Sequence, residues 1–120
     1  YTDDNRIVLG FKNNDALKCA FEIIIKLTQI NMSSTKNYSE FLLKIGISRG
    51  RMTYYEDFNK LKKNVNLKHI EMLLNSTKIV NSIILDKNVY SALPENHKKY
   101  FTYEERNAEH PHYIFKVKFG

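Results

Sequence analysis

The sequence predicts a mixed domain of the α+β class, in which helices pack on an antiparallel-rich sheet. Three observations predict this class. Apolar residues recur at helical spacing from Asp15 to Ile30, the segment Tyr113–Phe119 places apolar residues on one face of a strand, and strands interleave with helices along the chain. The length of 120 residues indicates a single domain spanning 1–120.

The N-terminal half begins with a predicted strand and a long predicted helix. Arg6–Phe11 is a short apolar run with β-branched residues, which is typical of a strand, and Asn14 is placed to cap the helix that follows. The helix positions spaced by three or four residues are Leu17, Ala20, Phe21, Ile24, Leu27 and Ile30. Ile23 and Ile25 add bulk beside them, which predicts burial on more than one side of this helix.

Two strands and a helix are predicted next. After a polar loop, Phe41–Ile47 is a predicted strand and Arg51–Tyr55 is its predicted return strand. Asn66–Ser76 is a predicted helix with four leucine and isoleucine residues on one side: Leu67, Ile70, Leu73 and Leu74.

The C-terminal part is predicted to contain three more strands and one short helix. Ile79–Leu85 is a predicted strand, and Asp86 caps a short helix that Pro94 ends. Phe101–Tyr103 and Tyr113–Phe119 are the last two predicted strands. A sheet with helices packed on one face accommodates this order of elements.

Composition limits the possible functions. Cys19 is the only cysteine, so an internal disulfide is excluded, and we expect Cys19 to be a buried small hydrophobe in a reducing, cytoplasmic setting. No apolar run approaches the roughly 18 residues of a membrane span, and we expect no signal peptide. The net charge of +6 comes from scattered lysines, which we interpret as a solvated surface.

Four sequence pieces, in order, resemble the class III adenylate and guanylate cyclase homology domain. They are Asp15–Ile23, Leu43–Gly50 with its Gly-Ile-x-x-Gly pattern, Val65–Leu67 and Ile83–Leu93. The resemblance covers most of the chain from about residue 5 and implies a ferredoxin-like, nucleotidyl cyclase-like sheet. It also implies that the family's first strand and first helices lie upstream of the matched segment, so this chain would lack them.

The resemblance also implies where catalytic groups would stand. The family converts ATP or GTP into a cyclic nucleotide with two divalent metals, Mg or Mn, held by two aspartates at a dimer interface. Asn66 matches the asparagine that orients the ribose, although a helix N-cap would also explain it. The arginine position four residues later holds Ile70.

The metal-binding and base-reading positions are also altered. An ungapped match places Asn5 at the second metal aspartate, with Asp4 and Asp3 as neighbouring candidates for metal binding. The base-reading aspartate falls near Asn59, with Asp57 two residues away.

We therefore interpret the chain as a catalytically degenerate cyclase-like domain that forms a homodimer or heterodimer, or binds a nucleotide in the regulation of signalling. One alternative is an active, divergent cyclase completed by upstream or partner residues. Another is a basic nucleic-acid-binding module, for which Tyr54 and Tyr55 are the nearest aromatic candidates. A metal site made of Glu109, His110 and His112 is a further possibility that the spacing leaves open.

Overall fold

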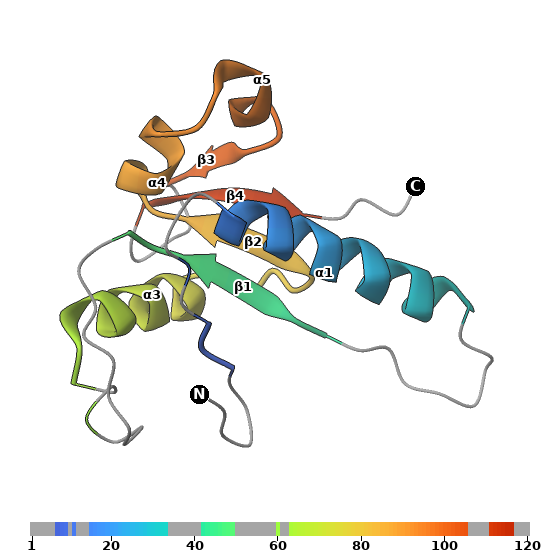
Figure 1. Ribbon diagram of the computed structural model, residues 1–120, viewed down its shortest axis with the longest axis horizontal. Helices are drawn as coiled ribbons and strands as arrows, with labels where there is room; N and C mark the ends of the chain where they lie inside the picture. The colour runs from blue at the N-terminus through green and yellow to red at the C-terminus, as the bar shows by residue number, and fades with distance from the viewer. Residues whose placement is uncertain are drawn as a thin grey trace.

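A computed structural model of the protein describes residues 7–9, 11, 15–33, 42–49, 60, 63–105 and 111–116. The helices and strands in chain order are α1 (Asp15–Ser33), β1 (Lys44–Ile47), α3 (Val65–Asn75), β2 (Ser82–Leu85), α4 (Lys87–Ser91), α5 (Glu95–Lys98), β3 (Thr102–Glu104) and β4 (His112–Lys116) (Figure 1). Among these residues, no helix is both long enough and apolar enough to cross a membrane.

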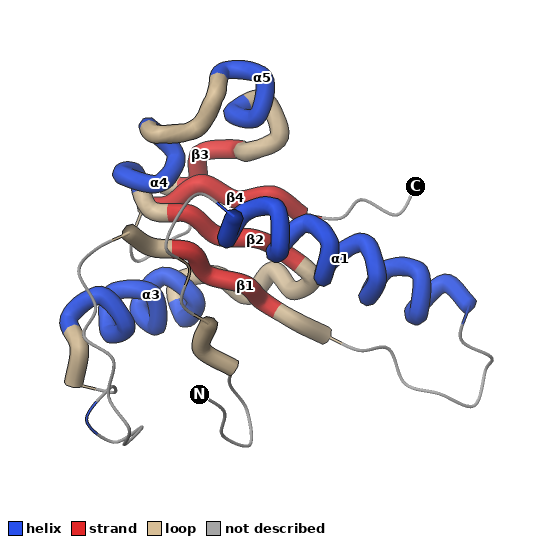
Figure 2. The backbone as a smooth tube through the Cα atoms, in the orientation of Figure 1, coloured by secondary structure: helices blue, strands red, loops and turns tan. Residues whose placement is uncertain are grey.

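The strands form one mixed sheet in the order β1-β2-β4-β3 (Figure 2). β1 and β2 are parallel, whereas β4 is antiparallel to both β2 and β3. Helix α3 lies between β1 and β2 in the chain, as a parallel pair requires, because parallel strands need a crossover connection. The predicted α+β class is therefore confirmed.

Helices cover both faces of the sheet, so the prediction of helices on one face only is wrong. On one face, Ile83 and Leu85 of β2 share a buried cluster with Ala20 and Ile24 of α1. On the other face, Ile84 of β2 is buried with residues of α3 and β4. All four residues of β2 are buried, and a continuous apolar run serving both faces is typical of a central strand covered on both sides.

Helix α1 is held to the sheet along one side. Its Phe21 ring makes edge-to-face contacts with Phe101 and Phe115, at centroid distances of 6.1 and 5.1 Å. Ile23 and Ile25 are exposed, by 37% and 54%, so the predicted burial on more than one side of this helix is wrong. The C-terminal half of α1 extends past the sheet (Figure 1), so nothing in the described sheet covers it.

The predicted strand Arg6–Phe11 is described only at residues 7–9 and 11, and these residues are in none of the four strands of the sheet. Ile7 forms an isolated bridge, while Val8, Leu9 and Phe11 have no strand assignment. The proposed return strand Arg51–Tyr55 lies outside the described residues. Two of the remaining predicted strands are shorter, because regular pairing starts at Lys44 in β1 and at Ser82 in β2. The other two are shifted by one residue: β3 starts at Thr102, one residue later than predicted, and β4 starts at His112, one residue earlier. Residues 117–119 of the last predicted strand lie outside the described residues.

Candidate functional site

The carboxyl ends of the parallel strands β1 and β2 meet at one edge of the sheet. The helix that connects them, α3, lies on one face, whereas α4, which follows β2, packs with α1 on the other face. In open α/β sheets, ligands bind at the carboxyl edge where successive connections leave toward opposite faces. Polar side chains of a candidate site are therefore expected at this edge.

A row of polar residues crosses the sheet at this edge. One set of cross-strand partners near this edge consists only of apolar and aromatic residues: Ile47, Leu85, Tyr113 and Tyr103. The next position on each strand is polar, and we call these four residues the polar row: Ser48, Asp86, His112 and Glu104. Neighbouring strands are about 5 Å apart, and alternation places this row on the α3 face, like Ile84 and Ile114.

Asp86 links two helices to the end of β2. Asp86 is 7% exposed. Its Oδ1 accepts a hydrogen bond of 2.8 Å from the backbone N–H of Val89, and this hydrogen bond caps α4. The other oxygen, Oδ2, lies 3.5 Å from Nε2 of His69 on α3, and the His69 side chain is 45% exposed. Asp86 is therefore a positioning residue for His69, whose imidazole remains accessible to a solute.

His112 anchors the far part of the polar row to α3. It is 1% exposed, and its Nδ1 lies 3.2 Å from Oγ of Ser76. The Ser76 hydroxyl donates its proton to the carbonyl of Leu73 at 2.7 Å, so Ser76 accepts from His112 and the imidazole carries its hydrogen on Nδ1. The predicted metal partners Glu109 and His110 lie outside the described residues.

The first turn of α3 corrects the interpretation of Asn66. The N-cap is Asn64, whose side chain accepts hydrogen bonds from the backbone N–H groups of Asn66 and Leu67 at 2.9 and 3.3 Å. Asn66 is thus inside the helix, and the alternative explanation of this residue as an N-cap is wrong. The helix start predicted at Val65–Leu67 is confirmed.

Helix α3 runs antiparallel to β1, so Asn66 lies toward the carboxyl edge. Ile70 contacts Gly46, while the later carbonyls of Leu74 and Thr77 accept hydrogen bonds from Nζ of Lys44, at the start of β1. Asn66 precedes Ile70 by about one helical turn, or 5.4 Å. The residue matched to the ribose-orienting asparagine is therefore on the side of α3 that approaches the polar row.

Ile70 occupies the position of the missing arginine, and its side chain packs against the sheet. A Cβ atom built on Gly46 would lie only 2.6 Å from Cγ2 of Ile70, which shows how closely the helix and strand approach. Ile70 is half-buried, and its aliphatic atoms fill the space beside Gly46. This position therefore contributes to packing.

The other predicted site residues cannot be placed. Asp3, Asp4, Asp57 and Asn59 all lie outside the described residues, as do Tyr54 and Tyr55. Within the parts of the chain that are described, no three His, Cys, Asp or Glu side chains come together as metal ligands.

An aromatic ladder lies on the opposite face from the polar row. Tyr90 of α4 stacks on Tyr113 of β4 with centroids 3.7 Å apart, and Tyr103 of β3 tilts against Tyr113 at 4.9 Å. Nζ of Lys98 lies 5.6 Å from the centroid of the Tyr90 ring. Partial burial, followed by the neighbouring Glu105 and Tyr113, raises the pKa of Tyr103 above its usual range.

The sequence predicted Asp86 only as a helix cap and did not single out His69. Their pairing depends on how α3 crosses the sheet, and no local pattern carries that information.

Comparison with family models, with curated proteins and with solved structures finds no match.

Proposed function

We propose that this protein is a catalytically degenerate nucleotidyl cyclase-like domain that acts in dimerisation or in nucleotide-linked regulation of signalling. Support comes from the element types on which the four resembling pieces fall. Asp15–Ile23 is in α1, Leu43–Gly50 contains β1, Val65–Leu67 begins α3, and Ile83–Leu93 contains most of β2 and all of α4. Helix and strand alternate over these pieces in the order that the resemblance implies.

The contact between Ile70 and Gly46 is the observation that carries the degenerate assignment. Asn66, which matches the ribose-orienting position, is in the first turn of α3. The position that would stabilise charge on the phosphates is instead an aliphatic side chain packed on β1. A cation that stabilises charge in the transition state lowers the activation free energy by several kcal/mol, on the order of 3. Loss of such a cation therefore favours nucleotide binding without turnover.

Metal ions would accompany a nucleotide only through residues that the structure does not describe. Asp3 and Asp4 remain the candidates for binding Mg or Mn, and the described residues offer no cluster in their place. When bound, such ions would neutralise phosphate charge. The described residues would contribute hydrogen bonds from Asn66 and from the accessible imidazole of His69, which Asp86 orients.

The two alternatives differ from this proposal in what they need. An active cyclase needs a partner or another segment to supply a cation in place of Ile70. A nucleic-acid-binding module is favoured by the cross-strand pair Tyr103–Tyr113, because neighbouring aromatic residues on a sheet can stack bases. Glu104 and Glu105 lie next to Tyr103 in the chain, and their charge opposes a phosphate backbone there.

Calorimetric titration with ATP and with GTP in the presence of Mn²⁺, followed by an assay for cyclic product, tests the proposal. We expect binding of at least one nucleotide and no cyclic product. Asn66→Ala should weaken binding about three- to tenfold, the value of one hydrogen bond. Asn75→Ala is the matched control, because Asn75 is an exposed residue at the other end of α3.

The same samples should be examined by analytical ultracentrifugation with and without nucleotide. Cyclic product from the purified protein would overturn the degenerate assignment. Neither nucleotide binding nor dimer formation would leave the proposed function without a basis, and salt-dependent binding to single-stranded RNA would favour the nucleic-acid alternative.

A further inference from the structure

One side of helix α3 is turned away from the sheet, and this side carries no acidic residue. On the sheet side, Leu73 is buried with Ile84 and Ile114. On the opposite side, which we call the outer face of α3, the exposed residues are Val65, Lys68, His69, Met72 and Asn75. At 3.6 residues per turn, these positions fall within about 120° of the helix circumference. Glu71, the only acidic residue of α3, is half-buried and lies outside this face.

Two apolar side chains stand on the outer face of α3. Val65 is 78% exposed and Met72 is 44% exposed. They are separated by about two helical turns, or about 10.5 Å, along one line of the helix. Contact of both side chains with water is unfavourable, so a partner with an apolar layer would gain free energy by covering them.

Lysines are concentrated at the same helix. Four of them fall between residues 60 and 68 of the sequence: Lys60, Lys62, Lys63 and Lys68. The structure describes Lys60, Lys63 and Lys68, and all three are exposed. The backbone N–H of Lys63 donates to the carbonyl of Lys60 at 3.2 Å, so a turn brings both residues next to the start of α3. Lys68 lies on the outer face itself, so positive charge stands on both sides of Val65 along the chain.

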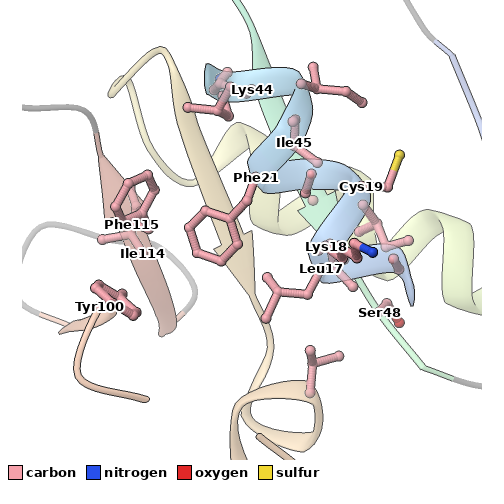
Figure 3. Close-up of a pocket in the computed structure, with 18 of the residues that line it drawn as sticks. Leu17, Lys18, Cys19, Phe21, Lys44, Ile45, Ser48, Tyr100, Ile114 and Phe115 are labelled. Atoms are coloured by element: carbon pink, nitrogen blue, oxygen red, sulfur yellow. The ribbon is translucent and has the colours of Figure 1, made fainter. Parts of the chain in front are cut away.

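Helix α1, on the opposite face of the sheet, has a different distribution of charge. Its Phe21 is directed toward Phe115 of the sheet (Figure 3). Its exposed side chains include acidic as well as basic residues, namely Asp15, Lys18, Glu22 and Lys26. Of the two long helices, α3 is therefore the one whose exposed side complements an anionic partner.

We propose that the outer face of α3 docks on the surface of a membrane that contains anionic phospholipids. Val65 and Met72 would enter the boundary between the headgroups and the acyl chains. The lysines would approach the headgroup phosphates and carboxylates. A helix that presents apolar residues together with lysines lies in the plane of such an interface. A cluster of about four or more Lys or Arg residues at such a helix is typical of proteins that bind phosphatidylserine surfaces.

A nucleic acid is a poorer match for this face. Its phosphates would attract the lysines, but it offers little apolar contact to Val65 and Met72. The outer face of α3 contains no Phe, Tyr or Trp on which a base could stack. A lipid surface supplies both the negative charge and the apolar layer.

Sedimentation of the whole chain with phospholipid vesicles, without nucleotide, tests the proposal. We expect binding to vesicles of phosphatidylcholine and phosphatidylserine in a ratio of about 2:1, and at least tenfold weaker binding to phosphatidylcholine alone. Added salt should weaken the binding, because it screens exposed charges. Combining Lys60→Gln, Lys63→Gln and Lys68→Gln should weaken it about 100-fold, since each lysine contributes about fivefold.

A charge-matched variant provides the control for the lysines. It replaces three exposed lysines of α1 and α4, on the other face of the sheet, by Gln: Lys18, Lys26 and Lys87. Its net charge equals that of the α3 lysine variant, but it should retain most of the vesicle binding. Because all the replaced side chains are exposed, both variants should keep the circular dichroism spectrum of the unchanged protein.

A second matched pair tests the apolar contact. Met72→Gln should weaken vesicle binding about fivefold, the effect of losing one partly buried apolar side chain. Met32, on α1, is 74% exposed, and Met32→Gln should leave the binding unchanged.

Each result decides the proposal. Vesicle binding that the α3 variants reduce and the α1 and α4 variants preserve supports docking through the outer face of α3. Absence of binding to phosphatidylserine vesicles overturns it, as does an equal loss in both lysine variants, which would indicate attraction to the overall charge alone. Binding that Met72→Gln leaves unchanged also overturns it, because the apolar side chain would then remain outside the lipid.

One further outcome would change the partner. Tighter binding to single-stranded RNA than to vesicles, lost in the α3 lysine variant, would assign this face to a nucleic acid and overturn the lipid partner. Because no nucleotide is present in these measurements, failure of lipid binding is distinguishable from failure of the proposed function.

Discussion

Gly46 is the residue at which β1 and α3 approach most closely. Its α-hydrogen faces Ile70 and Leu74, and a Cβ atom would lie 2.6 Å from Cγ2 of Ile70. We expect Gly46→Ala to lower the free energy of unfolding by about 1–3 kcal/mol, the usual cost of overpacking. Urea denaturation measures the effect.

A double-mutant cycle tests the cause of that loss. Ile70→Ala removes the atom that a new Cβ would strike, so the additional cost of Gly46→Ala should largely disappear in that background. Strictly additive costs would show that the glycine is needed for its backbone and not for the contact with Ile70.

The pKa of the half-exposed Tyr103 depends on the residues around it. Partial burial, Glu105 and Tyr113 raise the pKa of its phenol above the usual value of 10.0. The neutral form is thus favoured in the folded protein, and the resulting stability is present below pH 10 and lost as the pH rises through the folded pKa. We expect Glu105→Gln to lower this pKa in an ultraviolet titration of the phenolate, with Tyr103→Phe identifying the signal. An unchanged titration would contradict the role of Glu105.

At the scale of elements, Asp86 connects the end of β2 with both α4 and α3. Asp86→Asn keeps an oxygen that can accept from Val89 but removes the charge facing His69. We expect Asp86→Ala to destabilise the fold by about 1–2 kcal/mol and Asp86→Asn to cost less than half as much. Chemical denaturation of both variants compares them. Equal losses would indicate that the pair with His69, not the cap, carries the effect.

Lys44 of β1 donates hydrogen bonds to carbonyl groups at the C-terminal end of α3. Its ammonium donates to the carbonyls of Leu74 and Thr77 at 2.8 and 3.1 Å, where a helix has unsatisfied acceptors and a negative dipole end. Lys44→Met should destabilise the protein by about 1–2 kcal/mol and speed hydrogen exchange in the last turn of α3. Lys78→Met, at an exposed residue in the following loop, is the matched control, and an equal effect there would contradict this account.

Elements with strong local signals could be predicted from the sequence. The spacing of Leu17, Ala20 and Ile24 predicted α1, and Asp86 predicted the start of α4. The predicted end at Pro94 is wrong, because α4 ends at Ser91 and Pro94 instead precedes α5. The segment Arg6–Phe11 has a strand composition, but its described residues, 7–9 and 11, are not in a strand of the four-stranded sheet, because strand formation depends on tertiary context and not on composition alone. The polar row depends on the register of separate strands, so Ser48, Asp86, His112 and Glu104 could not be grouped in advance.

At the scale of the whole molecule, helices cover both faces of the sheet, whereas the sequence predicted helices on one face, and the difference has a physical reason. A sheet that helices cover on one face needs only strands in which apolar and polar residues alternate. A sheet that helices cover on both faces needs a central strand that is apolar on both sides. The run Ile83–Leu85 carried that signal, and β2 is the strand buried on both sides. Of the candidate site residues, Asn66 and His112 could be placed, the first in the opening turn of α3 and the second in β4, and the role of each stays a prediction.

The parallel pairing of β1 with β2 has a consequence for how the chain folds. The contact between Leu43 and Asn81 joins residues 38 positions apart, and α3 lies within that span. Such a closure loses chain entropy before any pairing compensates it, and non-local contacts of this kind slow folding. The antiparallel pair β3–β4 closes a much shorter stretch and can form early. Refolding should therefore build the C-terminal part of the sheet first, with β1 the last described strand to gain protection.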